Sequence, residues 1–286
     1  MPFKSVGLFG RYQDAAVKAL LGEIRSHLES RNVSVFLGDT THQEIDGLRI
    51  ADTGKSIAES IDLGIVVGGD GTMLHVTSAL AQANLPVIGI NRGRLGFLTD
   101  IPAERYAQEL DQVLAGDFEI ERRAMLKAQC FADGVTLAER YALNDVTLSK
   151  GATGKMIEFD TQVDGETVGQ SRGDGMIVAT PTGSTAYSLS AGGPILHPLL
   201  SAITLVPVSP HSLGQRPIVL SNHSTVALSL VGREADKANV FVDGLDFMTL
   251  EINQTLEIRS AEITAQLVRI NGHSHYEALR TKLGWG

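Results

Sequence analysis

The chain has 286 residues, of which 43% are hydrophobic and 20% charged, and its formal net charge is −9. At roughly 150 residues per domain, this length predicts two domains or one domain with a large insertion. The acidic balance argues against a nucleic-acid partner, because nonspecific binding to DNA or RNA needs a basic surface. The single cysteine, Cys130, excludes an internal disulfide and a cysteine-based zinc site, and its alternating surroundings predict a core position.

Nothing in the chain predicts a membrane or secretory destination. The first ten residues lack a charged leader followed by a long apolar segment. No run of about 18 apolar residues is present. The apolar stretch from Pro194 to Pro210 contains prolines that would break a spanning helix. We therefore expect a cytoplasmic protein without a membrane partner.

The N-terminal part of the chain alternates short apolar runs with segments of helical spacing. The predicted strands are Val6–Phe9, Val33–Leu37, Leu63–Val67 and Pro86–Ile90, and the predicted helices are Asp14–Ser30 and Thr72–Ala83. The polar stretch Gly38–Lys55 has poor periodicity and is expected to be a loop. Strands separated by helices indicate a parallel sheet with right-handed crossovers. In such a sheet, ligands bind at the carboxyl ends of the strands.

From Glu119 onward the pattern changes to closely spaced strands. These are predicted at Leu126–Phe131, Val135–Leu148, Met156–Val163, Thr167–Ser171, Met176–Ala179, Ile203–Val208, Ile218–Leu220, Thr225–Leu230, Val240–Val242, Thr249–Ile252, Thr255–Ile258 and Thr264–Arg269. Asp133-Gly134 and Asp164-Gly165 lie between strands and are strong hairpin signals. Helical segments are expected at Thr185–Ala191 and at Tyr276–Leu283.

Together these patterns predict a protein of the α/β plus β class with two domains. Residues 1–118 are expected to form a three-layer α/β nucleotide-binding domain, and residues 119–270 an antiparallel β-sandwich. The tail, residues 271–286, is expected to pack back onto the first domain.

The most informative motif is Gly68-Gly69-Asp70-Gly71-Thr72, which follows the apolar run Ile65–Val67. Glycines permit positive φ and a close approach of the backbone to a ligand. The N-terminus of the following helix attracts an anion, so a carboxylate at this place points to phosphoryl transfer. The alternative is a tight turn in which Asp70 caps the helix. The dinucleotide fingerprint Gly-x-Gly-x-x-Gly after a strand and the P-loop signature are absent.

Two further patches carry groups suited to a nucleotide. In the block Asp174–Pro194, a strand runs into a turn rich in serine, threonine and glycine, whose hydroxyl and N–H groups could bind sugar hydroxyls or phosphates. The alternative is a capped loop. Asn144-Asp145 is either a turn or a polar pair aimed at a ligand, in which Asp145 would accept hydrogen bonds from ribose hydroxyls.

These motifs resemble the bacterial NAD kinase family, in its order and at its spacing, over nearly the whole chain. The segments that carry the resemblance are Gly68–Thr72, Asn91–Leu98, Asn144-Asp145, Asp174–Pro194 and the terminal Lys282-Leu283-Gly284-Trp285. The Gly-Gly-Asp-Gly turn also occurs in phosphofructokinases and lipid kinases, whereas the Thr180–Pro194 block is highly specific. The resemblance implies ATP-dependent phosphorylation of the adenosine ribose 2′-hydroxyl of NAD, which gives NADP.

The resemblance also implies roles for single residues, with Asp70 as the general base. Phosphate and ATP contacts are expected at Gly68, Gly69, Gly71, Thr72, Arg92 and Arg94. NAD contacts are expected at Asp70, Gly71, His75, Asn144, Asp145, Lys155, Arg172, Asp174, Thr185, Ala186, Tyr187, Ser188 and Ser190. His75 is alternatively a solvent-facing helix residue, and the two arginines are alternatively surface residues.

Cofactor and partners follow from the same resemblance. Phosphoryl transfer needs a divalent cation, with magnesium expected. No dense carboxylate cluster marks a protein-held metal site, so the cation is expected to arrive bound to ATP. Family members are usually homo-oligomers whose NAD sites use residues of two subunits, which implies a homodimer or homotetramer.

Two other functions stay open at this stage. One is a lipid or sugar kinase that shares the glycine turn, and the other is a nucleotide-binding sensor without catalysis. The segment Phe241–Leu245 fits the family pattern only loosely, so we assign no ligand contact to it. The sequence assigns no role to the remaining histidines, His197, His211, His223, His273 and His275.

Overall fold

The computed structural model describes residues 2–11, 14–39, 57–93, 96–99, 101–151, 154–233, 236–270 and 274–284. The expected loop at Gly38–Lys55 lies outside these residues from position 40 onward. The chain divides into two compact units, of which unit 1 is Met1–Arg122 with Ala265–Gly286 and unit 2 is Arg123–Thr264. Within the part of the chain that is described, no helix is long and apolar enough to cross a membrane.

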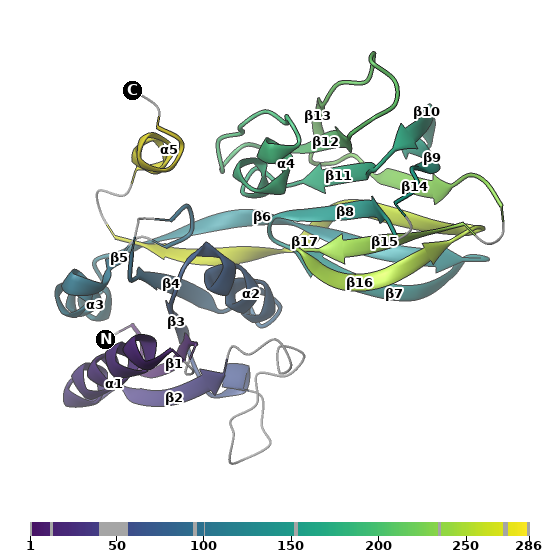
Figure 1. Ribbon diagram of the computed structural model, residues 1–286. Helices are drawn as coiled ribbons and strands as arrows, with labels where there is room; N and C mark the ends of the chain where they lie inside the picture. The colour runs from purple at the N-terminus through teal and green to yellow at the C-terminus, as the bar shows by residue number, and fades with distance from the viewer. Residues whose placement is uncertain are drawn as a thin grey trace. The chain divides into compact units, whose positions relative to one another are not determined.

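Unit 1 contains a parallel sheet in the order β2-β1-β3-β4, to which the end of β17 adds alongside β4 (Figure 1). Its strands are β1 (Ser5–Gly10), β2 (Ser34–Asp39), β3 (Leu63–Val67), β4 (Pro86–Asn91) and β5 (Ile101–Pro102). Its helices are α1 (Ala15–Ser30), α2 (Asp70–Ala81), α3 (Tyr106–Ala115) and α5 (His275–Leu283), with short 3₁₀ turns at Ile57–Glu59 and Ala103–Arg105.

Helices cover both faces of this sheet, because successive strand side chains point to opposite sides. Leu8 and Ile65 belong to one apolar cluster with residues of α1 and α3. On the opposite face, a Cβ added to Gly64 would lie 2.5 Å from Leu80 of α2. The three layers confirm the predicted α/β domain.

Unit 2 contains two antiparallel sheets (Figure 1). The first has the order β10-β9-β14-β17, with the hairpin β6-β7 joined to β17, and the second has the order β13-β12-β11-β8-β15-β16. The strands are β6 (Glu119–Ala132), β7 (Val135–Ala142), β8 (Asp145–Lys150), β9 (Ile157–Val163), β10 (Glu166–Gly173), β11 (Gly175–Ala179), β12 (Ala202–Val208), β13 (Ile218–Ser221), β14 (Val226–Leu230), β15 (Lys237–Val242), β16 (Leu245–Glu251) and β17 (Gln254–Arg269). A 3₁₀ turn (Gly183–Thr185) and the one-turn helix α4 (Tyr187–Ser190) follow β11.

The apolar core of unit 2 combines side chains from both sheets. Phe159 and Leu228 of the first sheet and Leu148 and Val178 of the second belong to one cluster, and each is fully buried. The same cluster includes Cys130, which is free and buried, so burial raises the pKa of its thiol. The predicted β domain and the predicted core position of this cysteine are therefore confirmed.

Both predicted hairpin turns have the backbone that their sequence favours. Asp133 and Gly134 have φ values of 50° and 78°, and Asp164 and Gly165 have values of 54° and 82°. Two successive positive φ values match the right-handed twist of the flanking strands. Asp243-Gly244 repeats the pattern between β15 and β16 with φ values of 52° and 76°.

Several elements differ from those expected. The strand expected over Val135–Leu148 is two strands, because the chain bends at Leu143-Asn144. The two strands expected between Thr255 and Arg269 are one continuous strand, β17, which contributes to both units. Helix α3 was not predicted, although its buried face, Leu110, Val113 and Leu114, has helical spacing.

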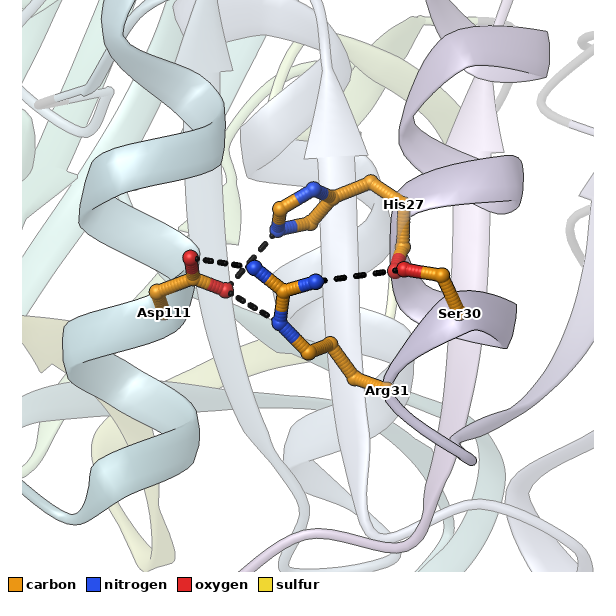
Figure 2. Close-up of polar contacts among 4 residues, drawn as sticks. All are labelled: His27, Ser30, Arg31 and Asp111. Atoms are coloured by element: carbon orange, nitrogen blue, oxygen red, sulfur yellow. Dashed lines mark hydrogen bonds and ion pairs between the residues drawn. The ribbon is translucent and has the colours of Figure 1, made fainter.

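A polar cluster joins α1 to α3 on the outside of unit 1 (Figure 2). The Asp111 carboxylate accepts hydrogen bonds from the Arg31 guanidinium at 3.1 and 2.8 Å, and it lies 2.9 Å from His27 Nε2. Arg31 also donates to the Ser30 hydroxyl at 3.3 Å. The hydrogen bonds from Arg31, followed by the His27 contact, hold the pKa of Asp111 below its usual range.

Replacing this carboxylate should weaken the contact between the two helices. We expect Asp111→Asn to lower the free energy of unfolding by about 0.5–1 kcal/mol at pH 7, because partly exposed ion pairs contribute little individually. A lowered pKa adds stability above the unfolded value that is lost as pH falls through the folded value. The difference from wild type, measured by urea unfolding, should therefore shrink between pH 5 and pH 3. Glu104→Gln, at an exposed position, is the control; a constant difference at all pH values would contradict the assignment.

Candidate functional site

The glycine turn after β3 leads directly into α2. The helix begins at Asp70 rather than at the expected Thr72, and its N-cap residue is Gly69. A glycine has no side chain to cap the helix, and no side-chain cap bond is present. The alternative in which Asp70 caps the helix is therefore wrong. The first turn of α2 offers N–H groups and the positive end of the helix dipole to an anion.

The glycines of this turn provide space rather than an unusual backbone. Gly68, Gly69 and Gly71 all lack positive φ values, so the turn does not use the left-handed conformation that glycine permits. A Cβ on Gly68 would lie 2.9 Å from Thr72, whereas Gly69 and Gly71 face open space. The absence of side chains at the last two positions leaves room for a ligand to approach the backbone.

The segment Gly96–Leu98, which follows β4, holds the Asp70 carboxylate. Its two oxygens accept hydrogen bonds from the backbone N–H groups of Phe97 and Leu98, each at 3.0 Å. A Cβ on Gly96 would collide with the Asp70 carboxylate. These two hydrogen bonds fix the orientation of the carboxylate at the start of α2.

A cation from the C-terminal helix completes this arrangement. Lys282 Nζ lies 3.4 Å from Asp70 Oδ2 and 6.0 Å from the centre of the Phe97 ring. Lys282 belongs to the terminal segment that resembles the family. Its position in the sequence did not predict a contact with Asp70, which lies 212 positions earlier. Trp285 of the same motif lies outside the described residues.

Of the two arginines expected to contact ATP, Arg92 and Arg94, the structure describes only Arg92. The Arg92 guanidinium donates to the Asp14 carboxylate at 3.1 Å, and Asp14 itself caps α1. The N–H groups of Val17 and Ala16 lower the pKa of Asp14, with a smaller contribution from Arg92. Arg94 lies outside the described residues. His75 is half-buried on α2, one turn beyond the glycines.

In unit 2, strand register brings three polar segments to one end of the second sheet. Asp145, the first residue of β8, is paired with Ala179 at the end of β11. Val146 is paired with Val242 at the end of β15. Asn144, the turn after β11 and the Asp243 turn therefore lie together. Antiparallel neighbours place the start of one strand beside the ends of the adjacent two.

Asp243 fixes the bend at Asn144. Its carboxylate accepts backbone hydrogen bonds from Leu143, Asn144 and Asp145 at 2.8, 2.7 and 3.2 Å. Its own N–H donates to the Asp145 carbonyl at 2.9 Å. The sequence assigned no ligand contact to this segment and did not predict these backbone contacts. The available signal was the Asp-Gly dipeptide, which predicts a turn but not the segment that its carboxylate holds.

The turn after β11 closes over the same bend. The Thr180 hydroxyl donates to the Leu143 carbonyl at 2.6 Å, and the Thr180 N–H donates to the Asn144 carbonyl at 2.9 Å. A Cβ on Gly183 would collide with that Asn144 carbonyl. The buried Arg123 donates to the Thr182 hydroxyl at 3.1 Å. Asn144-Asp145 is therefore both the bend and a polar pair held by its neighbours.

The following segment presents polar groups of different exposure. The Tyr187 side chain is 49% exposed, whereas Ser188 is fully buried with its hydroxyl 3.4 Å from that of Thr204. The Thr185 hydroxyl donates to the Thr182 carbonyl at 3.2 Å. Tyr187 is thus available to a ligand, while the Ser188 side chain supports the turn. Ala186 is half-buried and Ser190 is exposed.

Asp145 has unusual acid–base properties. It is 6% exposed, and burial followed by the negative charge of Asp243 raises its pKa to about 7, against a smaller opposing effect of the Thr147 hydroxyl. The carboxyl group is therefore partly protonated near neutral pH.

Lys155, Arg172 and Asp174 form a separate group. Asp174 precedes β11 and pairs with Lys150 at 2.8 Å, and Gly175 is in register with Ser149, so this group lies near the opposite end of β8 from Asp145. Lys155 and Arg172 line an open hollow of about 730 Å³, whose wall also includes Arg233, Lys237 and Asn239. The walls of this hollow do not include Asn144, Asp145 or Tyr187.

Metal-ligand clusters are not found in the described parts of either unit, where no group of three or more histidine, cysteine, aspartate or glutamate side chains converges. His273, of the pair His273 and His275, lies outside these parts.

Comparisons with known proteins give the family. Residues 22–118 match the ATP-NAD kinase N-terminal domain, and residues 143–270 match the ATP-NAD kinase C-terminal domain. This chain belongs to the NAD kinase family. An NAD kinase of Acinetobacter baylyi is 43% identical over 99% of this chain and 92% of its own length. An NAD kinase of Thiobacillus denitrificans is 40% identical over 100% and 98%.

Solved structures of the NAD kinase family share the fold. A crystal structure of an NAD kinase from Archaeoglobus fulgidus in complex with ATP has a TM-score of 0.75 at 28% identity, covering 98% of both chains. Yeast NADH kinase complexed with NADH has a TM-score of 0.87 at 24% identity, covering 100% of this chain and 88% of its own. Family membership decides against the lipid and sugar kinase alternatives.

The Lys282–Asp70 contact should matter for turnover. We expect Lys282→Met to lower the rate of NADP formation about 10–100-fold, because a charge-assisted hydrogen bond contributes roughly 1.5–3 kcal/mol. Lys282→Arg should retain more activity than Lys282→Met. Arg280→Met, on the exposed face of the same helix, is the matched control. An equal loss in the two methionine variants, measured at saturating ATP and NAD, would contradict a specific role.

Proposed function

We propose that this enzyme transfers the γ-phosphoryl group of ATP, bound as its magnesium complex, to the adenosine ribose 2′-hydroxyl of NAD. A bond forms between the ribose oxygen and the γ-phosphorus, the bond to the β-phosphate oxygen breaks, and ADP leaves. The observation that carries this proposal is a carboxylate held rigidly at an uncapped helix N-terminus, in a chain of the NAD kinase family.

In unit 1, Asp70 acts as general base for the hydroxyl proton. The N–H groups of Phe97 and Leu98 leave the carboxylate in one orientation, and Lys282 supplies a neighbouring positive charge. Such positioning with charge compensation is the main contribution a protein makes to phosphoryl transfer. The open backbone at Gly69 and Gly71, with the N-terminus of α2, receives phosphate oxygens.

In unit 2, the bend at Asn144-Asp145 binds the nucleotide. Asp145 accepts hydrogen bonds from ribose hydroxyls, as acidic residues do in other nucleotide sites. The exposed Tyr187 and the polar groups from Thr185 to Ser190 contact the adenosine part. Residues 119–270 thus serve as the NAD-binding domain.

The group Lys155, Arg172 and Asp174 serves the NAD site of a second copy of the chain. The separation of this group from Asp145 along β8 supports an enzyme that works as a homodimer or homotetramer. We place this enzyme in the cytoplasm. We expect the magnesium ion to arrive bound to the substrate ATP, whose phosphate charge it neutralises.

Replacement of the Asp70 carboxylate should slow phosphoryl transfer strongly while NAD still binds. We expect Asp70→Asn to lower turnover about 10²–10⁴-fold, the usual contribution of a general base, and to leave NAD affinity within about tenfold. NADP formation is followed with an NADP-specific dehydrogenase, and NAD binding by calorimetry. Near-normal turnover in the variant would refute the base role. Binding without turnover in the wild type would instead favour a sensor.

Shared sites can be tested with mixed oligomers. Asp70→Asn and Arg172→Ala chains are co-expressed with different affinity tags, and the mixed species is purified. If the two residues serve one site from different subunits, a mixed dimer has one intact site and about half of the wild-type activity. The control mixes Asp70→Asn with Lys282→Met, which contact each other within one chain and should restore nothing. Absence of restoration in both mixtures would count against shared sites.

A further inference from the structure

Two buried carboxyl groups lie on neighbouring strand ends in unit 2. Asp145 is 6% and Asp243 8% exposed, and their backbones are joined by the hydrogen bond from the Asp243 N–H to the Asp145 carbonyl. Two carboxylates in one buried place repel each other, so such pairs hold a proton at higher pH than isolated groups do.

The backbone contacts decide which member of the pair carries the proton. Asp243 accepts three N–H groups, from Leu143, Asn144 and Asp145, and these donors favour its ionised form. A proton on Asp243 would weaken the bonds that hold the bend. The ionised form of Asp145 is less well stabilised, because, within the described residues, its carboxyl group accepts one hydrogen bond, from the Thr147 hydroxyl at 3.2 Å.

The surroundings of Asp145 come from three elements. Its own strand β8 supplies the Thr147 hydroxyl, the β15–β16 turn supplies the Asp243 charge, and the turn after β11 supplies the Thr180 hydroxyl and backbone groups. A cation also reaches the turn after β11, where the Arg123 guanidinium donates to the Thr182 hydroxyl. Burial and Asp243 together raise the pKa of Asp145 to about 7.

We propose that the pair Asp145 and Asp243 binds a single proton in the free enzyme. This proton is on Asp145, and NAD binding expels it. Two ribose O–H groups then donate to the Asp145 carboxylate, and the proton passes to solvent. Asp243 is a positioning residue in this scheme, because it shapes the bend and sets the proton affinity of its neighbour. The proposal rests on the proposed binding of the NAD ribose at Asp145.

The consequence is a nucleotide affinity that depends on pH. For a group with a pKa of about 7 that must ionise on binding, the dissociation constant for NAD should be about tenfold higher at pH 6 than at pH 8. The direct measurement is calorimetry of NAD binding at pH 6.5 in two buffers of different ionisation enthalpy. We expect release of about 0.5–0.8 proton per NAD bound.

Two neighbours should shift this pH dependence in opposite directions. Asp243→Asn removes the repelling charge, so the midpoint should move to lower pH, together with weaker NAD binding. Thr147→Val removes a hydroxyl that stabilises the carboxylate, so the midpoint should move to higher pH. A purely structural role for either side chain would weaken binding without these opposite shifts. Asp246→Asn, at an exposed position two residues beyond the Asp243-Gly244 turn, should leave the midpoint unchanged.

Asp145→Asn cannot titrate and should bind NAD without releasing a proton. Proton release that persists in this variant, proton uptake by the wild type, or identical heats in both buffers would each overturn the proposal. These outcomes require that the wild type binds NAD. No binding of NAD by the wild type would instead refute the proposed function, so the two failures are distinguishable even if Asp243→Asn does not fold.

Discussion

Each of the two polar turns is organised by a carboxylate that accepts backbone N–H groups from a segment distant in the sequence. Asp70 holds Phe97 and Leu98 in unit 1, and Asp243 holds Leu143 and Asn144 in unit 2. A carboxylate can accept several hydrogen bonds at once, so one side chain can hold two loops together. Glycines at the same places admit this close approach, because a Cβ on Gly96 or on Gly183 would collide with its neighbour.

The two sites differ in how negative charge is balanced. Asp70 has a cation close by, Lys282, which fits the role of general base that we propose for it. Asp145 has a second carboxylate as its neighbour and is buried, which raises its pKa to about 7. Equivalent residue types therefore have different chemistry, because their neighbours and their burial differ.

Local sequence was a good guide wherever neighbouring residues decide the structure. The parallel sheet of unit 1, the hairpins at Asp133-Gly134 and Asp164-Gly165 and the buried Cys130 all follow from periodicity or turn chemistry. Errors occurred where a segment depends on a distant partner. The bend that divides Val135–Leu148 is held by Asp243, about 100 positions later. The strand β17 continues through residues 259–263, where apolar alternation is weak, because it extends from a ladder with β14 to one with β4.

The sequence by itself determined the class of each domain, the glycine turn after β3, the polar block after β11 and the family likeness, because these depend on residue types at short spacing. Only the tertiary structure decided that α2 begins at Asp70, that Arg92 pairs with Asp14, and that Lys282 and Asp243 belong to the two sites. Residues that lie close together in the sequence determine the local backbone conformation and which face of a helix or strand is exposed. Which charges meet, and how far burial changes their acidity, depends on chain crossings that bring residues 100 or more positions apart into contact.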